Sequence, residues 1–289
     1  MADQVLTQQP VPSVIRRRRI LPRARGNAAI YIGGGVIVFL VLVAILAPVL
    51  APDDPNNIEL SNTLQGPSAD HPLGTDGSGR DILSRLIYGT RLSLAGPLLV
   101  VALSALLAIP LGLLAGFRGG FVDTILSRTW DAMFAFPPLL LAIVIVASFG
   151  PGFWTATIAI TVIYIPLLAR VVRGQVLVER EKAYIDAGRA QGFSSARLAG
   201  RHVLPNIAPT IIAQSTLNFG YALIDLAALA FLGLGVQPPT ADWGAMLAEG
   251  RKFILTNPEE MIFASIAISI TVVAFNLLGD ALTRRVRGD

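Results

Sequence analysis

The chain contains 289 residues, of which 53% are hydrophobic and only 15% are charged, and its formal net charge is +4. This balance is typical of a membrane protein. Neither basic patch carries the interleaved aromatic residues of a base-stacking surface, so nucleic acid is not an expected partner. The absence of cysteine excludes a disulfide scaffold, a haem-attachment motif and thiolate metal sites.

Six stretches with little or no charge are each long enough to cross the hydrocarbon core of a bilayer, which needs about 20 residues. They are Ala28–Leu50, Leu92–Phe117, Ala132–Phe149, Phe153–Ala169, Ile207–Gly235 and Met261–Gly279. We therefore predict an all-α polytopic membrane protein with six transmembrane helices. Its predicted parts are a basic tail (1–27), a first helix (28–50), an extracytoplasmic loop (51–91), a core domain with five helices (92–280) and a short tail (281–289).

The distribution of Lys and Arg predicts the orientation. If the N-terminal tail, the loop near Arg118, the loop from Arg170 to Arg201 and the C-terminal tail share one side, that side carries 18 of the 23 basic residues. The positive-inside bias then places both termini in the cytoplasm. The apolar run after Arg16–Arg19 is longer than the core of a signal peptide, so we interpret it as a retained first helix.

The extracytoplasmic loop is acidic and contains the segment HPLGTDGSGRDILSRLIYGTR, from His71 to Arg91. Its glycines and Asp76 suit turns. Asp81 is placed to begin a helix that continues through Tyr88. The residues alone indicate an interfacial helix at the level of the lipid headgroups.

Gly150-Pro151-Gly152 divides an uncharged run of 38 residues into a helical hairpin. At the inner end of the third stretch, Asp131 follows Arg128 by three residues. We expect these two side chains to form an ion pair on one helix face, with a role at an inner gate as the alternative.

A polar, basic segment from Tyr184 to Asn206, YIDAGRAQGFSSARLAGRHVLPN, lies between the fourth and fifth apolar stretches. A solvated helix held between two membrane spans is suited to contact a partner. Gly192 suits the C-cap of one helix and Ser194 the N-cap of the next. The alternative is an ordinary amphipathic cytosolic loop, which has the same local geometry.

Four polar residues follow one face of the fifth stretch. Gln214, Asn218, Tyr221 and Asp225 recur at intervals of four, three and four residues, which confines them to a stripe about 60° wide. An intramembrane carboxylate usually faces a bundle interior or a wet cavity. The stripe therefore indicates either a translocation path, in which Asp225 meets a cationic group of the substrate, or hydrogen bonds that hold helices together. The sequence favours neither.

Two aromatic residues, Trp243 and Phe253, lie in the outer loop between the fifth and sixth stretches. We expect them to anchor this loop at the membrane interface, with contact to a docking protein as the alternative. Asn257-Pro258-Glu259-Glu260 is suited to begin the sixth helix, since it combines an N-cap residue, a first-turn proline and two acids.

The spacing within the polar segment resembles the EAA loop, EAA-x3-G-x9-I-x-LP, of permease subunits in binding-protein-dependent ABC importers. Asp186-Ala187-Gly188 is followed by three residues, Gly192, nine residues and His202-Val203-Leu204-Pro205. Asp186 and Gly188 replace the Glu and second Ala of the motif, and His202 replaces its Ile. Because glycine costs up to about 1 kcal/mol of helix propensity relative to alanine, we expect this turn to rely on a docking partner.

Two further blocks resemble the dipeptide, oligopeptide and nickel branch of these permeases. One is HPLGTD-x2-GRD-x2-SRL-x-YG, which begins at His71. The other is FLGLGVQPP, from Phe231 to Pro239, followed by DWGAML from Asp242 to Leu247. With the polar segment, these blocks span most of residues 70–250.

The resemblance implies a type I ABC importer permease in the bacterial inner membrane. It also implies three kinds of partner: a second homologous permease subunit, two ATPase subunits or domains that bind ATP and magnesium, and an extracytoplasmic substrate-binding protein. The residues expected to couple to the ATPase lie in the loop 173–206 and are Tyr184, Asp186, Ala187, Gly188, Gly192 and Pro205. The expected substrate is a di- or oligopeptide, with nickel chelates or another small ligand as the alternative.

The sequence contains no catalytic constellation. Gly77-Ser78-Gly79-Arg80 lacks the GK[ST] ending of a phosphate loop, and the two histidines, His71 and His202, are predicted on opposite sides of the membrane. We therefore expect no metal site, cofactor or enzymatic activity in this chain. Two other classes of protein are the alternatives. An ion-driven carrier would require an inverted repeat, which is not visible in the sequence, and a scaffold without transport does not account for the polar stripe.

Overall fold

The computed structural model describes residues 24–287, and the regular elements within that range are all helices. In chain order they are α1 (Ala24–Leu50), η1 (Leu60–Asn62), α2 (Ile82–Arg118), α3 (Gly120–Phe134), α4 (Pro138–Phe149), α5 (Phe153–Glu179), α6 (Ala183–Ala190), α7 (Ser195–Leu198), η2 (Ala199–Val203), α8 (Leu204–Phe231), α9 (Trp243–Gly250), η3 (Arg251–Phe253) and α10 (Glu259–Arg287). The predicted all-α class is confirmed. The predicted hairpin at Gly150–Gly152 is also present, between α4 and α5.

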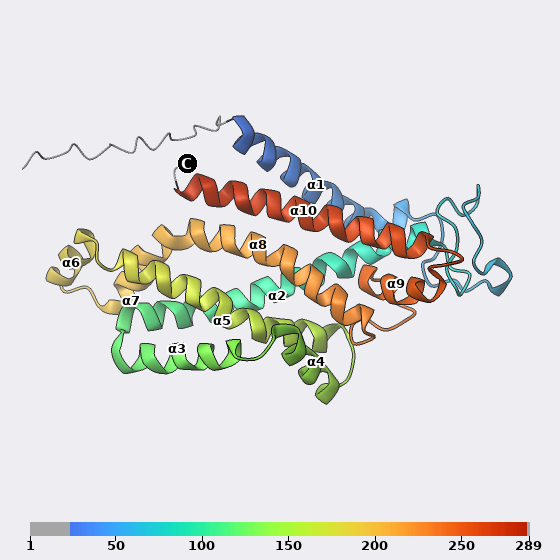
Figure 1. Ribbon diagram of the computed structural model, residues 1–289. Coiled ribbons are helices and arrows are strands. Elements are labelled where there is room, and N and C mark those ends of the chain that lie inside the picture. Colours follow the sequence, from blue (N-terminus) through green and yellow to red (C-terminus); the bar gives the residue numbers. More distant parts are fainter. Residues whose placement is uncertain (1–23, 288–289) are drawn as a thin grey trace, which may run out of the picture.

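The long helices lie along one another, and the short elements collect at the two ends of the bundle (Figure 1). α6 and α7 lie at one end, on the same side as the start of α1 and the finish of α10. The segment 51–81 and α9 lie at the opposite end. We call the end with α6 and α7 the inner end, and the end with residues 51–81 and α9 the outer end, following the predicted orientation.

Four of the described helices are long and apolar enough to cross a membrane, namely α1, α2, α5 and α10. α3 and α4 add a fifth span if they are taken together. α8 has 28 residues but is not among these four helices, and Gln214, Asn218 and Asp225 lie within it. The count of six spans and their orientation therefore stay predictions, as do the boundaries drawn from them.

The prediction of one continuous third helix, Ala132–Phe149, is wrong. The chain is helical to Phe134, breaks over the next three residues and starts α4 at Pro138, with an angle of 86° between α3 and α4. Two consecutive prolines, Pro137 and Pro138, supply no backbone N–H and disfavour the helical conformation of the residue before them. Composition alone did not show this bend because both arms are apolar.

α2 and α5 are in close backbone contact toward the inner end of the bundle. A β-carbon added to Gly112 would lie 2.6 Å from Val172 Cβ and 2.7 Å from the Ala169 carbonyl oxygen. At Gly116, one turn later, it would lie 2.7 Å from Val176 Cβ. This is a small-residue G-x-x-x-G contact, which lets two membrane helices approach closely.

The inner end belongs to the same hydrophobic core as these two helices. Ile185 on α6, Leu198 on α7 and Val203 on η2 are fully or almost fully buried, and they cluster with Val172 and Val176 of α5. Since protein interiors are close-packed, a displacement of α6 or α7 is transmitted to the bundle rather than absorbed by a flexible linker.

Candidate coupling surface and translocation path

The end of α6 is a Schellman motif with Gly192 as its left-handed residue. Gly192 has φ +80°, and its N–H donates to the Arg189 carbonyl at 2.9 Å. The Phe193 N–H donates to the Gly188 carbonyl at 3.0 Å, which completes the motif. Ser194 then caps α7 by accepting from the Arg197 N–H at 3.3 Å. Both predicted caps are confirmed as local geometry.

Gly188 has a packing reason that the sequence did not disclose. A β-carbon at this position would lie 2.6 Å from Leu198 Cδ2, so a glycine lets α6 pack directly against α7. The conformational cost of a helical glycine is therefore offset inside the chain, by the buried contact with Leu198. The structure therefore explains the glycine in this turn without a docking partner.

Three side chains converge on Glu179, the last residue of α5, and close the base of the loop. Tyr184 Oη donates to Glu179 Oε1 at 2.8 Å, and Lys182 Nζ lies 2.7 Å from Glu179 Oε2. Asn206, at the start of α8, donates to the same Oε1 at 3.1 Å. Burial and the bond to Glu179 raise the pKa of Tyr184, which stays a neutral donor. The loop thus begins and ends at one hydrogen-bonded point.

The outward surface of α6 combines small or short side chains with the exposed Arg189. Asp186 and Ala187 are exposed, and Asp186 Oδ1 lies 3.1 Å from Arg189 Nη1 in an exposed pair. Gly192 is exposed at the tip, whereas Gly188 faces inward and Tyr184 is half-buried. Pro205, in the first turn of α8, is exposed but belongs to the base of the loop. The six predicted residues therefore divide into an outward surface and a supporting interior.

The polar stripe of α8 is not uniform. Gln214 Nε2 donates to Asn218 Oδ1 at 2.9 Å, and Asn218 is 1% exposed, with no partner for its Nδ2 within residues 24–287. Tyr221, one turn later, is 54% exposed. One half of the stripe therefore bonds within the helix and packs, while the other half reaches the surface of this chain.

Asp225 has a partner that sequence reasoning missed. Tyr164, from the middle of α5 and 5% exposed, donates to Asp225 Oδ2 at 2.8 Å. Asp225 itself is half-buried. A tyrosine inside a predicted apolar span was the available signal, because a buried hydroxyl usually finds a hydrogen-bond partner.

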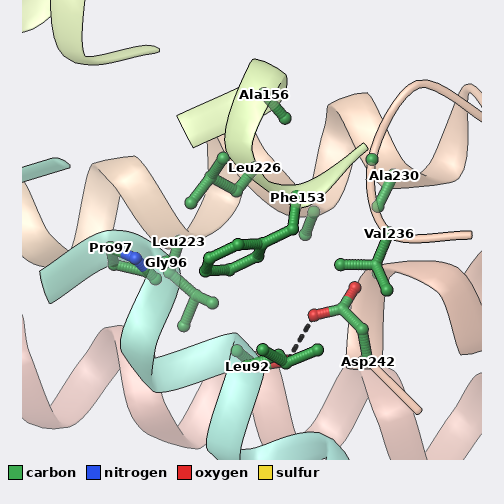
Figure 2. Close-up of a pocket in the computed structure, with 14 residues that line it drawn as sticks. Leu92, Gly96, Pro97, Phe153, Ala156, Leu223, Leu226, Ala230, Val236 and Asp242 are labelled. Atoms are coloured by element: carbon green, nitrogen blue, oxygen red, sulfur yellow. Dashed lines mark hydrogen bonds between the residues drawn. The ribbon is translucent and has the colours of Figure 1, made fainter. Parts of the chain in front are cut away.

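A small cavity lies between α2, α5, α8 and α9 near the outer end (Figure 2). Its volume of about 30 Å³ has room for water but not for a peptide. Most of the residues that line it are apolar, such as Phe153 and Leu226. The carboxylate of Asp242 is a polar group in this lining. Burial raises the pKa of Asp242, although Ser93 Oγ donates to it at 2.8 Å. This cavity is not a passage for substrate.

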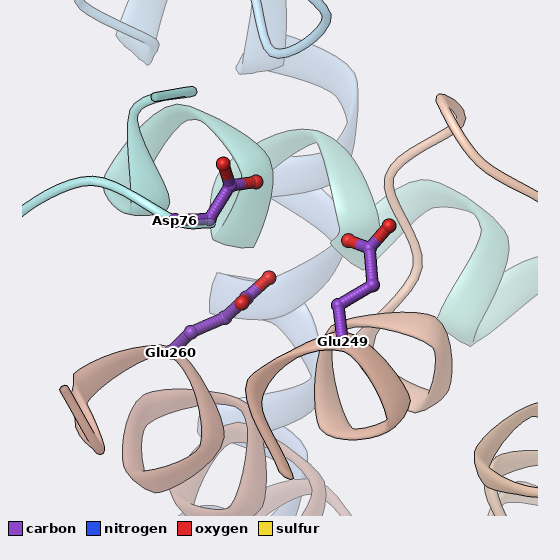
Figure 3. Close-up of side chains that lie close together, drawn as sticks. All are labelled: Asp76, Glu249 and Glu260. Carbon is purple, nitrogen blue, oxygen red and sulfur yellow. The ribbon is translucent and has the colours of Figure 1, made fainter. Parts of the chain in front are cut away.

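The outer end holds a buried ionic cluster of five side chains, which we call the outer cluster. It contains Asp76 and Arg80 from the segment before α2, Arg85 from α2, Glu249 from α9 and Glu260 from α10. Figure 3 shows its three carboxylates, contributed by three separate elements, and one oxygen of each lies within 4.8 Å of the others.

Two guanidinium groups hold the outer cluster together. Arg80 Nε lies 2.6 Å from Asp76 Oδ2, and Arg80 Nη2 lies 2.8 Å from Glu249 Oε2. Arg85 Nη2 lies 2.8 Å from the same Glu249 oxygen. Burial alone would lower the pKa of Arg80, but the neighbouring carboxylates outweigh burial and raise it. The segment before α2 is thereby fastened to α9.

Two sequence-based expectations near the ends of the bundle are wrong. Asp131 pairs with Arg170 of α5 at 2.7 Å rather than with Arg128, since α3 and α5 lie side by side. Trp243 is 1% exposed and donates its indole N–H to the Leu86 carbonyl at 3.0 Å, so it neither anchors the loop in lipid nor meets a docking protein. Asp242 caps α9 by accepting from the Ala245 N–H.

Comparisons with known proteins agree with this architecture. Residues 108–288 match the family described as binding-protein-dependent transport system inner membrane component. Residues 17–67 match the N-terminal transmembrane domain of oligopeptide transport permease C.

Individual relatives give the same picture. The chain is 42% identical to a dipeptide transport system permease protein of Alkalihalophilus pseudofirmus, over 92% of this chain and 87% of that one. It is 42% identical to a glutathione transport system permease protein of Pectobacterium atrosepticum, over 86% and 83%. A solved structure titled as the MetNI methionine ABC transporter in inward-facing conformations covers 70% of this chain and 95% of its own, with a TM-score of 0.57 and 20% identity.

Proposed function

The chain belongs to the family of binding-protein-dependent transport system inner membrane components, and from this premise we propose that it forms half of a translocation path for peptides and couples that path to ATP-hydrolysing partners. Its role as a permease component of an ABC importer and its type I fold follow from the family and the matching structure. The ion-driven carrier and the scaffold are thereby set aside.

The observation that carries the coupling proposal is the shared core of the inner end. Asp186, Ala187 and Gly192 form an exposed surface of small groups, suited to enter a cleft on an ATPase. Behind that surface, Ile185 and Leu198 pack against α5. In this proposal two ATPase subunits or domains bind ATP and magnesium, and their closing displaces α6 together with the bundle. A second homologous permease completes the path, and a substrate-binding protein delivers the substrate at the outer end.

We propose Asp225 as the residue that meets a cationic group of the substrate. One of its oxygens is held by Tyr164, which fixes the carboxylate and leaves the other oxygen without a protein partner among the described residues. Relatives are named for the transport of dipeptides, glutathione and D,D-dipeptides, which share a free amino group. Nickel chelates remain the second candidate cargo, and they offer Asp225 no ammonium.

Asp225→Asn tests this assignment. The amide is nearly isosteric, so the complex is expected to assemble normally. Loss of a charged hydrogen bond is expected to reduce uptake of peptides with a free amino group by about tenfold, with less effect on N-acetylated peptides. Assembly and uptake are measured separately in vesicles that carry the whole complex. Unchanged uptake of both peptide classes would exclude Asp225 from the path, and failed assembly would indicate an ion pair with another subunit.

The orientation is tested independently by reporters. A reporter fused after Asp289 is expected in the cytoplasm, and tags near Asn62 or Thr240 are expected outside, because of the asymmetric distribution of Lys and Arg. An externally accessible C-terminus would overturn the proposed topology, including the location of α6 at the ATPase side.

A further inference from the structure

The outer cluster has an unbalanced charge. Asp76, Glu249 and Glu260 bring three potential negative charges, and Arg80 and Arg85 bring two positive ones. All five groups are buried apart from Glu249, whose side chain is 18% exposed. A net charge of this kind is costly to keep away from water, so the cluster should carry one more positive charge than its side chains provide.

The unpaired negative charge can be located by following the contacts. Asp76 accepts from Arg80 and from backbone N–H groups, and Glu249 accepts from both arginines. Glu260 is 2% exposed, and its Oε1 has no hydrogen-bond partner among the described residues. The nearest guanidinium atom, Arg85 Nε, lies 3.9 Å from it, which is too far for a hydrogen bond. Of the three carboxyl groups in the outer cluster, Glu260 is therefore the one to which no donor in the described part of the chain is hydrogen-bonded.

A metal ion does not fit as the missing positive charge of the outer cluster. Arg85 Nε lies 3.3 Å from Asp76 Oδ2 and 3.9 Å from Glu260 Oε1, so a guanidinium already stands between two of the three carboxylates. A divalent cation would also change the net charge from one negative to one positive, with both arginines close by. A proton satisfies both requirements, because it needs no space beside Arg85 and it adds only one positive charge.

We propose that Glu260 is a proton-binding site and that it is a neutral carboxylic acid at neutral pH. The charged groups that face it are Asp76 and Arg80 from the segment before α2, Arg85 from α2 and Glu249 from α9, with Glu259 beside it on α10. With one proton bound, three acids and two arginines are electrically balanced. The proton thus completes the contact between α10 and the rest of the outer end.

The folded protein is expected to lose stability as the pH rises. Glu260 retains its proton in the folded protein at a pH where it is ionised in the unfolded chain. The stability that this gives is complete at low pH, and it declines as pH rises through the folded protein's titration of Glu260. The outer cluster then carries a net negative charge, and the contact between α10 and the outer segment weakens.

The test compares thermal unfolding of the purified complex from about pH 6 to about pH 9, for the wild type and for Glu260→Gln. The midpoint temperature of the wild type is expected to fall by roughly 3–6 °C over this range, while that of E260Q is expected to change by less than half as much. Glu249→Gln removes an acceptor that both arginines use, so it is expected to be destabilised at every pH. Asp70→Asn, exposed in the same outer segment, controls for a general charge effect.

A second measurement reports the proton directly. The infrared difference spectrum, wild type minus E260Q at neutral pH, is expected to contain the carbonyl band of one protonated carboxylic acid, which separates Glu260 from other buried acids such as Asp242. Three results would overturn the proposal: failure of E260Q to fold or destabilisation equal to that of E249Q, an unchanged infrared band in E260Q, or stabilisation of the wild type by sodium, calcium or magnesium that E260Q abolishes. None of these readouts depends on transport.

Discussion

The two ends of the bundle use charged residues in opposite ways. At the outer end, five ionisable side chains from four segments are buried against one another. At the inner end, the charged residues of α6 are exposed, and the Asp186–Arg189 pair is open to solvent on both sides. The outer charges fasten segments of one chain together. Glu179 at the base of the loop is buried and bonded, but the exposed charges of α6 contribute little to the fold and remain available to another molecule.

Because of this difference, substitutions at the two ends should have different consequences for folding and for transport. A buried ion pair that loses one partner leaves a charge without compensation, whereas an exposed pair is screened by water and salt. Substitutions at the outer end should therefore affect folding first and transport only as a result. Substitutions on the outward surface of α6 should affect transport in a protein that still folds.

The largest effect is expected for Arg85→Met. This change removes a fully buried guanidinium and leaves Glu249 and Asp76 with less positive charge, at a cost of about 3–5 kcal/mol. The measurement is the thermal midpoint of the purified complex. Arg251→Met, at an exposed position of the same end, is the matched control and should change little. Equal effects of the two changes would break the distinction between buried and exposed charges.

An intermediate effect on stability, with loss of transport, is expected for Gly192→Val. A β-branched residue at φ +80° costs about 1–2 kcal/mol, which distorts the tip of α6 while the core behind it stays packed. The protein should remain in the membrane, and ATP-dependent uptake should be lost. Gly200→Val is the control, because Gly200 is exposed in η2 and has no neighbour within 4 Å of an added β-carbon. Normal transport by Gly192→Val would remove the coupling assignment.

The smallest effect on stability is expected for Arg189→Ala. Its pair with Asp186 spans three residues on one exposed helix face, and such pairs contribute no more than about 0.5 kcal/mol. A thermal midpoint within experimental error of the wild type is therefore expected. If this change destabilised the protein as much as Arg85→Met, the inner end would be held by its charges as the outer end is, and the comparison would fail.

Local features were predictable from the sequence because they depend on neighbouring residues. Asp81 begins α2 by accepting from the Ser84 N–H, and Gly192 and Ser194 end one helix and start the next, as expected. The bend at Pro137 was also within reach, since two consecutive prolines are a local signal. The apolar composition of residues 132–149 favours one straight span, whereas the conformation that proline imposes produces the bend.

Side-chain contacts between residues far apart in the sequence could not be predicted from it. Asp131 could be matched only to Arg128 by helical spacing, whereas its partner lies 39 residues away. In the outer cluster Arg80 and Glu249 are hydrogen-bonded although they lie 169 positions apart in the sequence, and no periodicity connects them. For the same reason the stripe on α8 was placed on one face correctly, but the contact of Asp225 with Tyr164 required the packing of α5 against α8.

The close contact of α2 and α5 at Gly112 and Gly116 limits where the bundle can bend. Because these two backbones touch near the inner end, we expect the two helices to turn together, and α5 is one helix from Phe153 to Glu179 with Pro166 inside it. At 1.5 Å per residue this helix is about 40 Å long, so a tilt of about 5° around its outer end moves its inner end by roughly 3.5 Å. A rotation of this size disturbs the side-chain packing near Phe153 very little. At α6, however, it gives a displacement close to the distance of about 3.8 Å between consecutive Cα atoms.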